Sequence, residues 1–421
     1  MEDATKKQAD AGKIPAHSWY ALGVLTLVYV LNFLDRVLIY FMFTPIKAEL
    51  KFTDLQLGLL GATSFAIFYT VLGIPFGRMA DRGSRKKLIA GGLAVWSLFS
   101  GLTGFTHSFE TMFLCRLMVG VGEATLGPAA LSLLSDYFPP RLRASVTAIY
   151  SSAIAVGSGL ALALGGQVQS LLGWRWAFFL LGFPGLLVCL LVLSLREARR
   201  GETEREPARY TARDWKVLFR SAPLRYHYAG YALFGLASNQ LSIWGVTFFA
   251  RAHGLDLKLI GLLGGLLSLL AGVPGTVLGG VLADRLRRRG RGGRMLFSAS
   301  CALLSVPVWL ALLFSNGAWV LLAANFLLLA LSLMWLGAAA ADVHDIAGPQ
   351  LRGLGVAVYF FAVNFAAYGV GAPLIGHLND RLGAAADPQM MRYALLLCPL
   401  ASLVAALLLW RGGRKLEESP A

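Results

Sequence analysis

Long apolar stretches alternate with short polar breaks along almost the whole chain. Each stretch is close to the roughly 20 residues that a helix needs to cross the hydrocarbon core of a bilayer. We therefore predict an all-α membrane protein with twelve transmembrane helices. The predicted spans are 19–43, 56–79, 88–106, 109–134, 144–170, 176–195, 226–250, 257–281, 295–314, 318–341, 354–378 and 391–411.

A polar stretch carrying charges of both signs separates the sixth span from the seventh. We predict that this stretch, 196–225, links two six-helix bundles formed by 19–195 and 226–411. Short tails, 1–18 and 412–421, complete the chain. An even number of spans places both tails on the same side of the membrane.

The two predicted bundles share short motifs at equivalent places. The pattern G-x-x-x-D-R occurs at 77–82, after the second span, and again at 280–285, after the eighth. The pattern P-x-L-R occurs at 140–143, before the fifth span, and at 349–352, before the eleventh. Parallel repeats of this kind are a known transporter plan, so we expect a substrate path between the halves.

Composition and charge fit this organisation. The chain of 421 residues is 57% hydrophobic and 14% charged, which leaves no room for a large soluble domain. The net charge of +15 comes from basic residues spread over many short loops, most of them on the side of the tails. By the positive-inside rule the tails are cytoplasmic, and a nucleic-acid partner is not indicated.

Only four ionisable residues lie deep within the predicted spans: Asp35, Arg36, Arg116 and Glu123. Each charge costs about 2.5–3.5 kcal/mol at the bilayer centre unless it is paired or hydrated. Their charges sum to zero, which suggests a mutually neutralising cluster. Arg116 and Glu123 are about two helical turns apart on one face, so Asp35 or Arg36 could bridge between them.

The sequence resembles the major facilitator superfamily over nearly its whole length. The resemblance rests on the motif at 77–86, its partial copy at 280–285, R-x-x-x-G-x-G at 116–122 and G-W-R-W-A-F at 173–178. Ser84 stands where the family often has glycine, and the fifth span lacks the Gly-Pro pair of many drug antiporters. That difference disfavours multidrug export.

A cytoplasmic latch is expected at the repeated motifs. An aspartate at a helix end among cations can pair with arginine in one conformer only, and the resemblance implies this gating role. Asp81 could pair with Arg85 or Arg141. The alternative is a loop that only fixes topology. The predicted gate residues are Gly77, Asp81, Arg82, Arg85, Arg141, Arg143, Asp284, Arg285 and Arg352.

The segments 31–36 and 116–124 together resemble the Spinster branch of the superfamily. Members of that branch move sphingolipids and lysophospholipids and are thought to couple this transport to protons. The resemblance implies that Glu123 and Asp35 take part in proton coupling. It also implies that Arg36 and Arg116 govern their charge or meet an anionic head group. The alternative is a purely scaffolding ion-pair cluster.

Several polar and aromatic side chains could line the substrate path, although each could equally pack against a neighbouring helix. The candidates are Tyr29, Phe33, Asn239, Gln240, Trp244, Asn325, Tyr359, Asn364 and Tyr368. Asp342, His344 and Asp345 at the end of the tenth span suggest gating or capping rather than a metal site. No cofactor, metal or nucleotide site is expected, and no nucleophile with an apposed base indicates an enzyme.

We therefore expect a monomeric, proton-coupled secondary transporter of the bacterial inner membrane that works by alternating access. Its expected substrate is an amphipathic, anionic, lipid-like solute. A symporter of small organic anions or sugar acids is the alternative within the same class, because Arg36 and Arg116 would suit that substrate equally. A membrane sensor that keeps the fold without transport is the alternative from another class.

Overall fold

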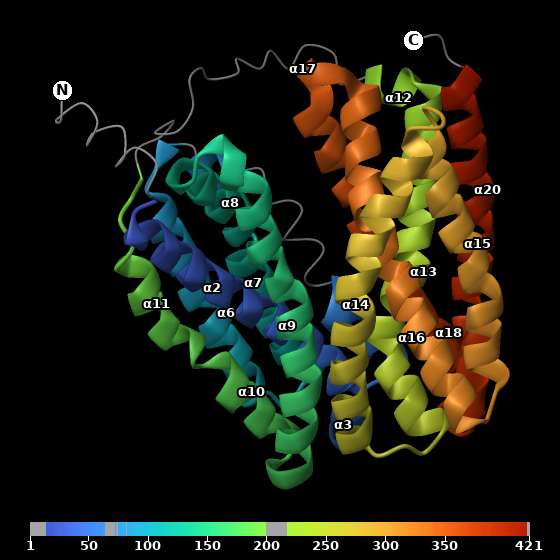
Figure 1. Cartoon of the computed structure of the whole chain (residues 1–421). Coiled ribbons are helices and arrows are strands. Elements are labelled where there is room, and N and C mark those ends of the chain that lie inside the picture. Colours follow the sequence, from blue (N-terminus) through green and yellow to red (C-terminus); the bar gives the residue numbers. More distant parts are fainter. Residues whose placement is uncertain (1–13, 64–71, 73–74, 81, 199–216, 419–421) are drawn as a thin grey trace, which may run out of the picture.

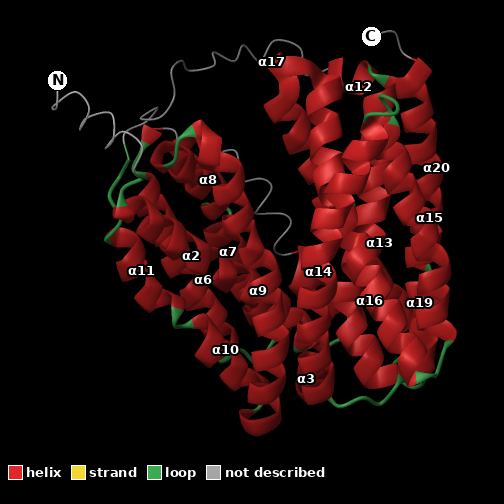
Figure 2. Ribbon diagram, in the orientation of Figure 1, coloured by secondary structure: helices red, strands yellow, loops and turns green. Residues whose placement is uncertain are grey.

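A computed structural model describes residues 14–63, 72, 75–80, 82–198 and 217–418. Throughout these ranges the regular elements are helices, and no strand is found in them (Figure 2). Most of the predicted N-terminal tail, part of the second span, Asp81 and most of the linker lie outside the described residues.

The first half of the chain contributes one group of helices. Several predicted spans consist of two consecutive helices, because the chain bends within the span. The elements are α2 (Ala16–Phe41), α3 (Phe43–Leu50), α4 (Asp54–Gly58), η1 (Leu59–Thr63), α6 (Arg85–Thr103), α7 (Phe109–Glu123), α8 (Leu126–Tyr137), α9 (Pro140–Leu172), α10 (Trp174–Gly182) and α11 (Gly185–Leu193).

The second half contributes another group, which follows the predicted seventh to twelfth spans. Its elements are α12 (Val217–Arg220), α13 (Ala222–Ala252), α14 (Leu257–Arg287), α15 (Gly293–Phe314), α16 (Ala318–Met334), α17 (Leu336–Asn364), η2 (Phe365–Gly371), α18 (Ala372–Arg381), η3 (Pro388–Met390), α19 (Met391–Leu395) and α20 (Leu397–Glu418).

The two groups of helices stand side by side (Figure 1). We call the end where α2 begins and α20 ends the proximal end, which is uppermost in Figure 1, and the opposite end the distal end. Near the distal end α9 packs on α14 and α4 packs on α18, so helices of both halves touch there. Towards the proximal end the groups diverge (Figure 1).

Eight described helical segments are long and apolar enough to cross a membrane. Helices also occupy the predicted third, fourth and seventh spans, as α6, α7 with α8, and α13. These carry more polar residues, including the deep charges of α7, which lowers their hydropathy. Many leucines remain exposed on α14 and α20, as expected for surfaces that face lipid.

Three boundaries differ from the predicted spans. α13 starts at Ala222 because the Ser221 side chain caps the N–H of Leu224. α20 continues past the predicted end of the twelfth span because its polar end still packs: Leu416 is buried. α17 runs through the break expected between the tenth and eleventh spans. Apolar periodicity alone does not show that a polar segment stays helical.

Candidate functional site

The four deep charges form two crossed ion pairs between α2 and α7. Arg36 donates from Nη2 to Glu123 Oε2 at 2.8 Å, and Arg116 donates from Nη1 to Asp35 Oδ2 at 3.2 Å. Adjacent residues of α2 thus pair with residues two turns apart on α7. The two residues of α2 meet the two charges of α7 as expected, but neither of them bridges Arg116 and Glu123: each pairs with one of the two.

Additional contacts distinguish the two pairs. Asp35 also accepts a hydrogen bond from the Ser100 hydroxyl of α6. Arg36 donates to Asn32 Oδ1 at 3.2 Å, and its Cζ lies 4.8 Å from the centre of the Phe33 ring. The side chain of Arg36 is 13% exposed, whereas that of Glu123 is 0% exposed. Arg36 is therefore the most exposed member of the cluster.

Glu123 is held at a break in the fourth span. α7 ends at Glu123 and α8 begins at Leu126, and the Thr125 hydroxyl donates to the carbonyl of Gly122. A Cβ at Gly122 would lie 2.5 Å from the carbonyl oxygen of Gly92, so glycine is needed for α6 to approach this closely. Oε1 of Glu123 is buried without a hydrogen-bond partner in the described part of the chain.

The predicted lining residues fall into two groups. Gln240, Trp244 and Tyr359 are fully buried, and the Gln240 amide and Trp244 indole donate to the backbone oxygens of Ala367 and Ala372. Their contacts are those of helix packing. The other predicted residues are only partly buried: Tyr29, Phe33, Asn239, Asn325, Asn364 and Tyr368.

Two of these half-buried groups connect elements of the second half. Tyr368 donates to Asn239 Oδ1 at 2.8 Å, which joins η2 to α13. In the first half, Tyr29 stacks on Tyr150 at 4.4 Å between ring centres. Asn325 lies instead on the wall of a separate cavity, described below.

The predicted gate is only partly described. Asp81 is outside the described residues, and the side chains of Arg141 and Arg352 are not described. Gly77 has nothing within 4 Å of an added Cβ, and Arg82 and Arg285 are exposed. Arg143 donates to the Ser135 carbonyl at 3.1 Å. The pairing proposed for Asp81 therefore stays a prediction.

Within the described part of the chain, the contacts of the Arg85 side chain are with Ser132, Asp136 and the segment after α11. Its guanidinium, 1% exposed, pairs with Asp136 of α8 and, from Nε, with Glu197 at 3.0 Å. Burial alone would raise the pKa of Glu197, but hydrogen bonds from Ser84 and Arg85 outweigh it and lower the pKa below its ordinary value. Arg85 thus ties α6 to α8 and to the chain after α11.

A charged contact joins the halves at the distal end. Asp54, at the start of α4, is 0% exposed and accepts from Lys47 at 2.6 Å. It also accepts from Arg251, the last turn of α13, at 2.8 Å. Sequence reasoning missed this contact, because each residue lies near a span end and reads as part of a solvated loop.

Backbone groups reinforce the same contact. Asp380, near the end of α18, accepts from the backbone N–H groups of Asp54 and Leu55 at 2.9 and 2.8 Å. A carboxylate there satisfies donors that the first turn of α4 leaves open. A Cβ at Gly376 would lie 2.3 Å from the Asp54 carbonyl oxygen, so the two backbones touch. The distal end is therefore closed in this conformation.

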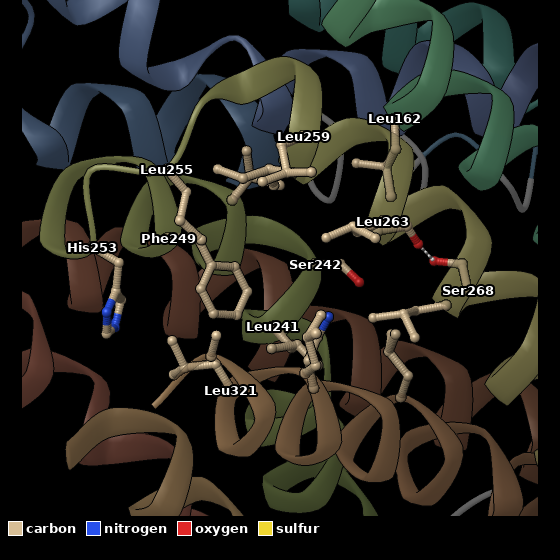
Figure 3. Close-up of a pocket in the computed structure, with 18 of the residues that line it drawn as sticks. Leu162, Leu241, Ser242, Phe249, His253, Leu255, Leu259, Leu263, Ser268 and Leu321 are labelled. Atoms are coloured by element: carbon tan, nitrogen blue, oxygen red, sulfur yellow. Dashed lines mark hydrogen bonds between the residues drawn. The ribbon is translucent and has the colours of Figure 1, made fainter. Parts of the chain in front are cut away.

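An apolar cavity of about 390 Å³ lies among α13, α14 and α16, beside α2 and α9 (Figure 3). Leucine is the commonest residue of its wall, with Leu241, Leu263 and Leu321 among the labelled residues. The Ser268 hydroxyl is satisfied by the Gly264 carbonyl at 2.7 Å. Such a space suits a hydrocarbon chain better than a small anion.

No group of three or more His, Cys, Asp and Glu side chains in the described ranges could hold a metal ion. Asp342 and Asp345, which suggested gating or capping, lie near Arg294, at 4.0 and 2.9 Å, and the gating or capping role stays a prediction. The described site is therefore one of paired charges beside an apolar cavity.

Two groups of apolar helices, with ion pairs buried inside the first, are typical of a membrane transporter. The chain belongs to the major facilitator superfamily, whose family model matches residues 25–366. It is a Spinster-like member. It is 30% identical over 438 residues to protein spinster homolog 1 of Mus musculus, covering 94% of this chain and 81% of that protein.

Other relatives carry different names. The chain is 31% identical over 399 residues to an MFS-type efflux pump of Mycolicibacterium smegmatis, covering 94% of this chain and 92% of that protein. It is 29% identical over 400 residues to a probable sulfoacetate transporter, SauU, of Cupriavidus necator, covering 89% and 90%.

Among solved structures, the chain is similar to a bacterial homolog of the human lysosomal transporter Spinster, in an inward-facing and unoccupied conformation. The TM-score is 0.84 at 25% sequence identity, over 97% of this chain and 100% of that one. The family and the fold together show a multi-pass membrane transporter of a small molecule, and not an enzyme.

Proposed function

We propose that the chain is a proton-coupled secondary transporter of an amphipathic, anionic, lipid-like solute of the sphingolipid or lysophospholipid type, working by alternating access. The observation that carries the proposal is the crossed arrangement of Asp35, Arg36, Arg116 and Glu123. Charges inside a membrane bundle are costly and mark functional sites by default.

The proposed proton coupling is supported by the two different environments of the Glu123 oxygens. Oε2 is held by Arg36, while Oε1 is buried without a hydrogen-bond partner among described groups. If an anionic head group takes Arg36, Glu123 loses its counter-charge and gains affinity for a proton. Conversely, protonation of Glu123 frees Arg36. The binding of a proton to Glu123 and the binding of an anion to Arg36 would thus affect each other through the Arg36 guanidinium.

Asp35 is the second proposed proton site, more firmly held than Glu123. It has both Arg116 and the Ser100 hydroxyl as partners, and Arg116 is 2% exposed. We assign Arg116 to the charge balance of the cluster rather than to first contact with substrate. Arg36, the more exposed guanidinium, is the proposed head-group contact.

The lipid-like character of the solute is supported by the apolar cavity near Leu263 and by the Spinster relatives. A small organic anion is the second candidate. It is favoured by the resemblance to the probable sulfoacetate transporter, and it would use Arg36 without needing the cavity. The two candidates therefore differ in whether the cavity matters.

The described conformation supports an inward-facing state. The halves are bridged by Asp54 and Arg251 at the distal end and diverge towards the proximal end. The similar bacterial structure is itself inward-facing. We accordingly propose that the proximal end is cytoplasmic, that the predicted gate with Asp284 closes it in the opposite state, and that the protein acts as a monomer in a bacterial inner membrane.

A substrate screen in proteoliposomes tests this proposal. Lysolipids, sphingoid phosphates and small organic acids would each be measured with and without a pH gradient. We expect flux of a lysolipid or sphingoid phosphate that depends on the gradient. Flux of small organic acids alone would support the second candidate, and lipid flux indifferent to the gradient would contradict proton coupling.

A further inference from the structure

Five charged side chains gather at the proximal end of the second half. Arg294 of α15 donates from Nη2 to Asp284 Oδ1 at 2.8 Å and from Nη1 to Asp345 Oδ2 at 2.9 Å. Arg287 donates from Nε to the same oxygen of Asp345 at 3.2 Å. The fifth member is Asp342 of α17. We call these five residues the proximal charged cluster.

Asp342 differs from the other carboxylates of the cluster. Its Oδ1 is 4.0 Å from Arg294 Nη1, too far for a hydrogen bond. Its Oδ2 is buried and has no hydrogen-bond partner among described residues. The Asp342 side chain is 1% exposed, whereas those of Asp284 and Asp345 are 60% and 43% exposed. Water can therefore stabilise Asp284 and Asp345 but not Asp342.

The charge balance of the cluster also indicates that Asp342 is the least stabilised of the three carboxylates. Three carboxylates face two guanidiniums, and the hydrogen bonds of Arg294 and Arg287 go to Asp284 and Asp345. If all five groups were charged, the surplus negative charge would fall on the group without hydrogen bonds. A buried, unsatisfied carboxylate is among the most costly arrangements in a protein.

Among the side chains that the structure describes, the other packed elements supply no further cation to Asp342. On α13, Tyr231 is close enough to interact electrostatically with it, but its hydroxyl donates to Ser298 Oγ at 2.8 Å. His227 of the same helix is 0% exposed, and its Nε2 contacts the Ala339 carbonyl at 2.9 Å, one turn before Asp342. Neither residue donates a hydrogen bond to the carboxylate.

We propose that Asp342 holds a proton in this conformation and is a second proton-binding site, in the half of the molecule opposite to Glu123. One proton makes the cluster neutral and removes the buried charge. Protons reach Asp342 through its exposed neighbours Asp284 and Asp345. This site goes beyond the coupling proposed for Glu123 and Asp35, because it lies at the proximal end rather than at the crossed ion pairs.

The site also responds to conformation. Its members come from α14, α15 and α17, so a movement of these helices changes which carboxylate Arg294 holds. A state in which Arg294 or Arg287 reached Asp342 would release its proton to the proximal side. Proton occupancy of Asp342 would thereby report the conformer of the second half.

Infrared titration of the full-length protein in lipid tests the proposal. The carbonyl stretch of a protonated carboxylic acid should be present near neutral pH and disappear as the pH rises. Asp342→Asn should abolish this band, and Glu123→Gln should leave it. Identical bands in wild type and Asp342→Asn over the whole pH range would overturn the proposal, whatever the result for Glu123.

A second variant tests the proposal even if Asp342→Asn does not fold. Asp345→Asn removes a neighbouring negative charge, so the titration midpoint should fall by about one pH unit or more. Asp256→Asn, an exposed aspartate at the distal end of α14, is the matched control and should leave the midpoint unchanged. An unchanged midpoint in Asp345→Asn would also contradict the proposal.

Discussion

Arg251 of α13 donates to Asp54 of α4 at 2.8 Å, an ion pair that joins the two halves while Asp54 is fully buried. Removal of one partner from a buried pair costs about 3–5 kcal/mol, because the other charge is left without compensation. Asp54 also holds Lys47, so its loss would leave two cations together. This relationship makes Asp54 the centre of the distal closure.

We predict that Asp54→Asn shifts the conformers towards an open distal end. The shift should appear as a longer distance between spin labels placed at the distal ends of the two halves. Glu49→Gln is the matched control, because Glu49 pairs with Arg175 at the same end but within the first half. If both variants gave the wild-type distance distribution, Asp54 would not be part of a gate.

The cavity near Leu263 gives a prediction about substrate class. Leu263→Trp should fill part of the space of about 390 Å³ and reduce transport of a lipid-like solute, while a small organic anion would be unaffected. Overpacking of this kind costs about 1–3 kcal/mol. Initial flux rates of both solutes provide the measurement.

Leu266→Trp is the control for the cavity, because Leu266 is 52% exposed on the same helix and does not line it. Equal loss of lipid flux in Leu263→Trp and Leu266→Trp would show that the effect comes from the membrane-facing surface of α14. Unchanged lipid flux in Leu263→Trp would remove the cavity from the substrate path.

Glu197 gives a prediction about stability and pH. Its pKa in the folded protein is below its ordinary value, so the folded state favours the ionised carboxylate more than the unfolded chain does. The stabilisation is present above the unfolded pKa and is lost as the pH falls through the folded pKa. We expect Glu197→Gln to lower Tm at neutral pH and to differ less from wild type in acid.

Thermal unfolding in detergent, followed from neutral to acidic pH, measures this difference. Glu110→Gln is the control, since Glu110 is an exposed glutamate at the start of α7 and should change Tm little at any pH. A Tm difference for Glu197→Gln that is constant with pH would contradict the assignment of the stabilisation to ionised Glu197.

The sequence was most informative within the spans, where a polar group surrounded by lipid costs free energy. A charge within an apolar run needs a partner, and this identifies Asp35, Arg36, Arg116 and Glu123 as a cluster. Because Asp35 and Arg36 are adjacent on one helix, they point in different directions and pair with different residues. The transporter class followed from the same spans and motifs. Which residue pairs with which required the structure.

The sequence was uninformative near the span ends. Asp54, Arg251 and Asp380 look like ordinary loop charges, and their contact depends on the approach of two halves distant in the chain. The sequence analysis gives Asp342 the same role as its exposed neighbour Asp345, because apolar patterning cannot show that one carboxylate is buried and the other is not. The expectation that ionisable side chains are buried in the first half alone was therefore wrong: Asp342 and His227 are buried in the second.

Glu123 is proposed to couple protons to solute movement, and a flux measurement on a Glu123 variant tests this role. In proteoliposomes, Glu123→Gln should lose pH-driven accumulation of the solute while keeping exchange of solute at equal pH, because glutamine cannot release a proton. Glu110→Gln should behave as wild type. Full pH-driven accumulation by Glu123→Gln would contradict the account.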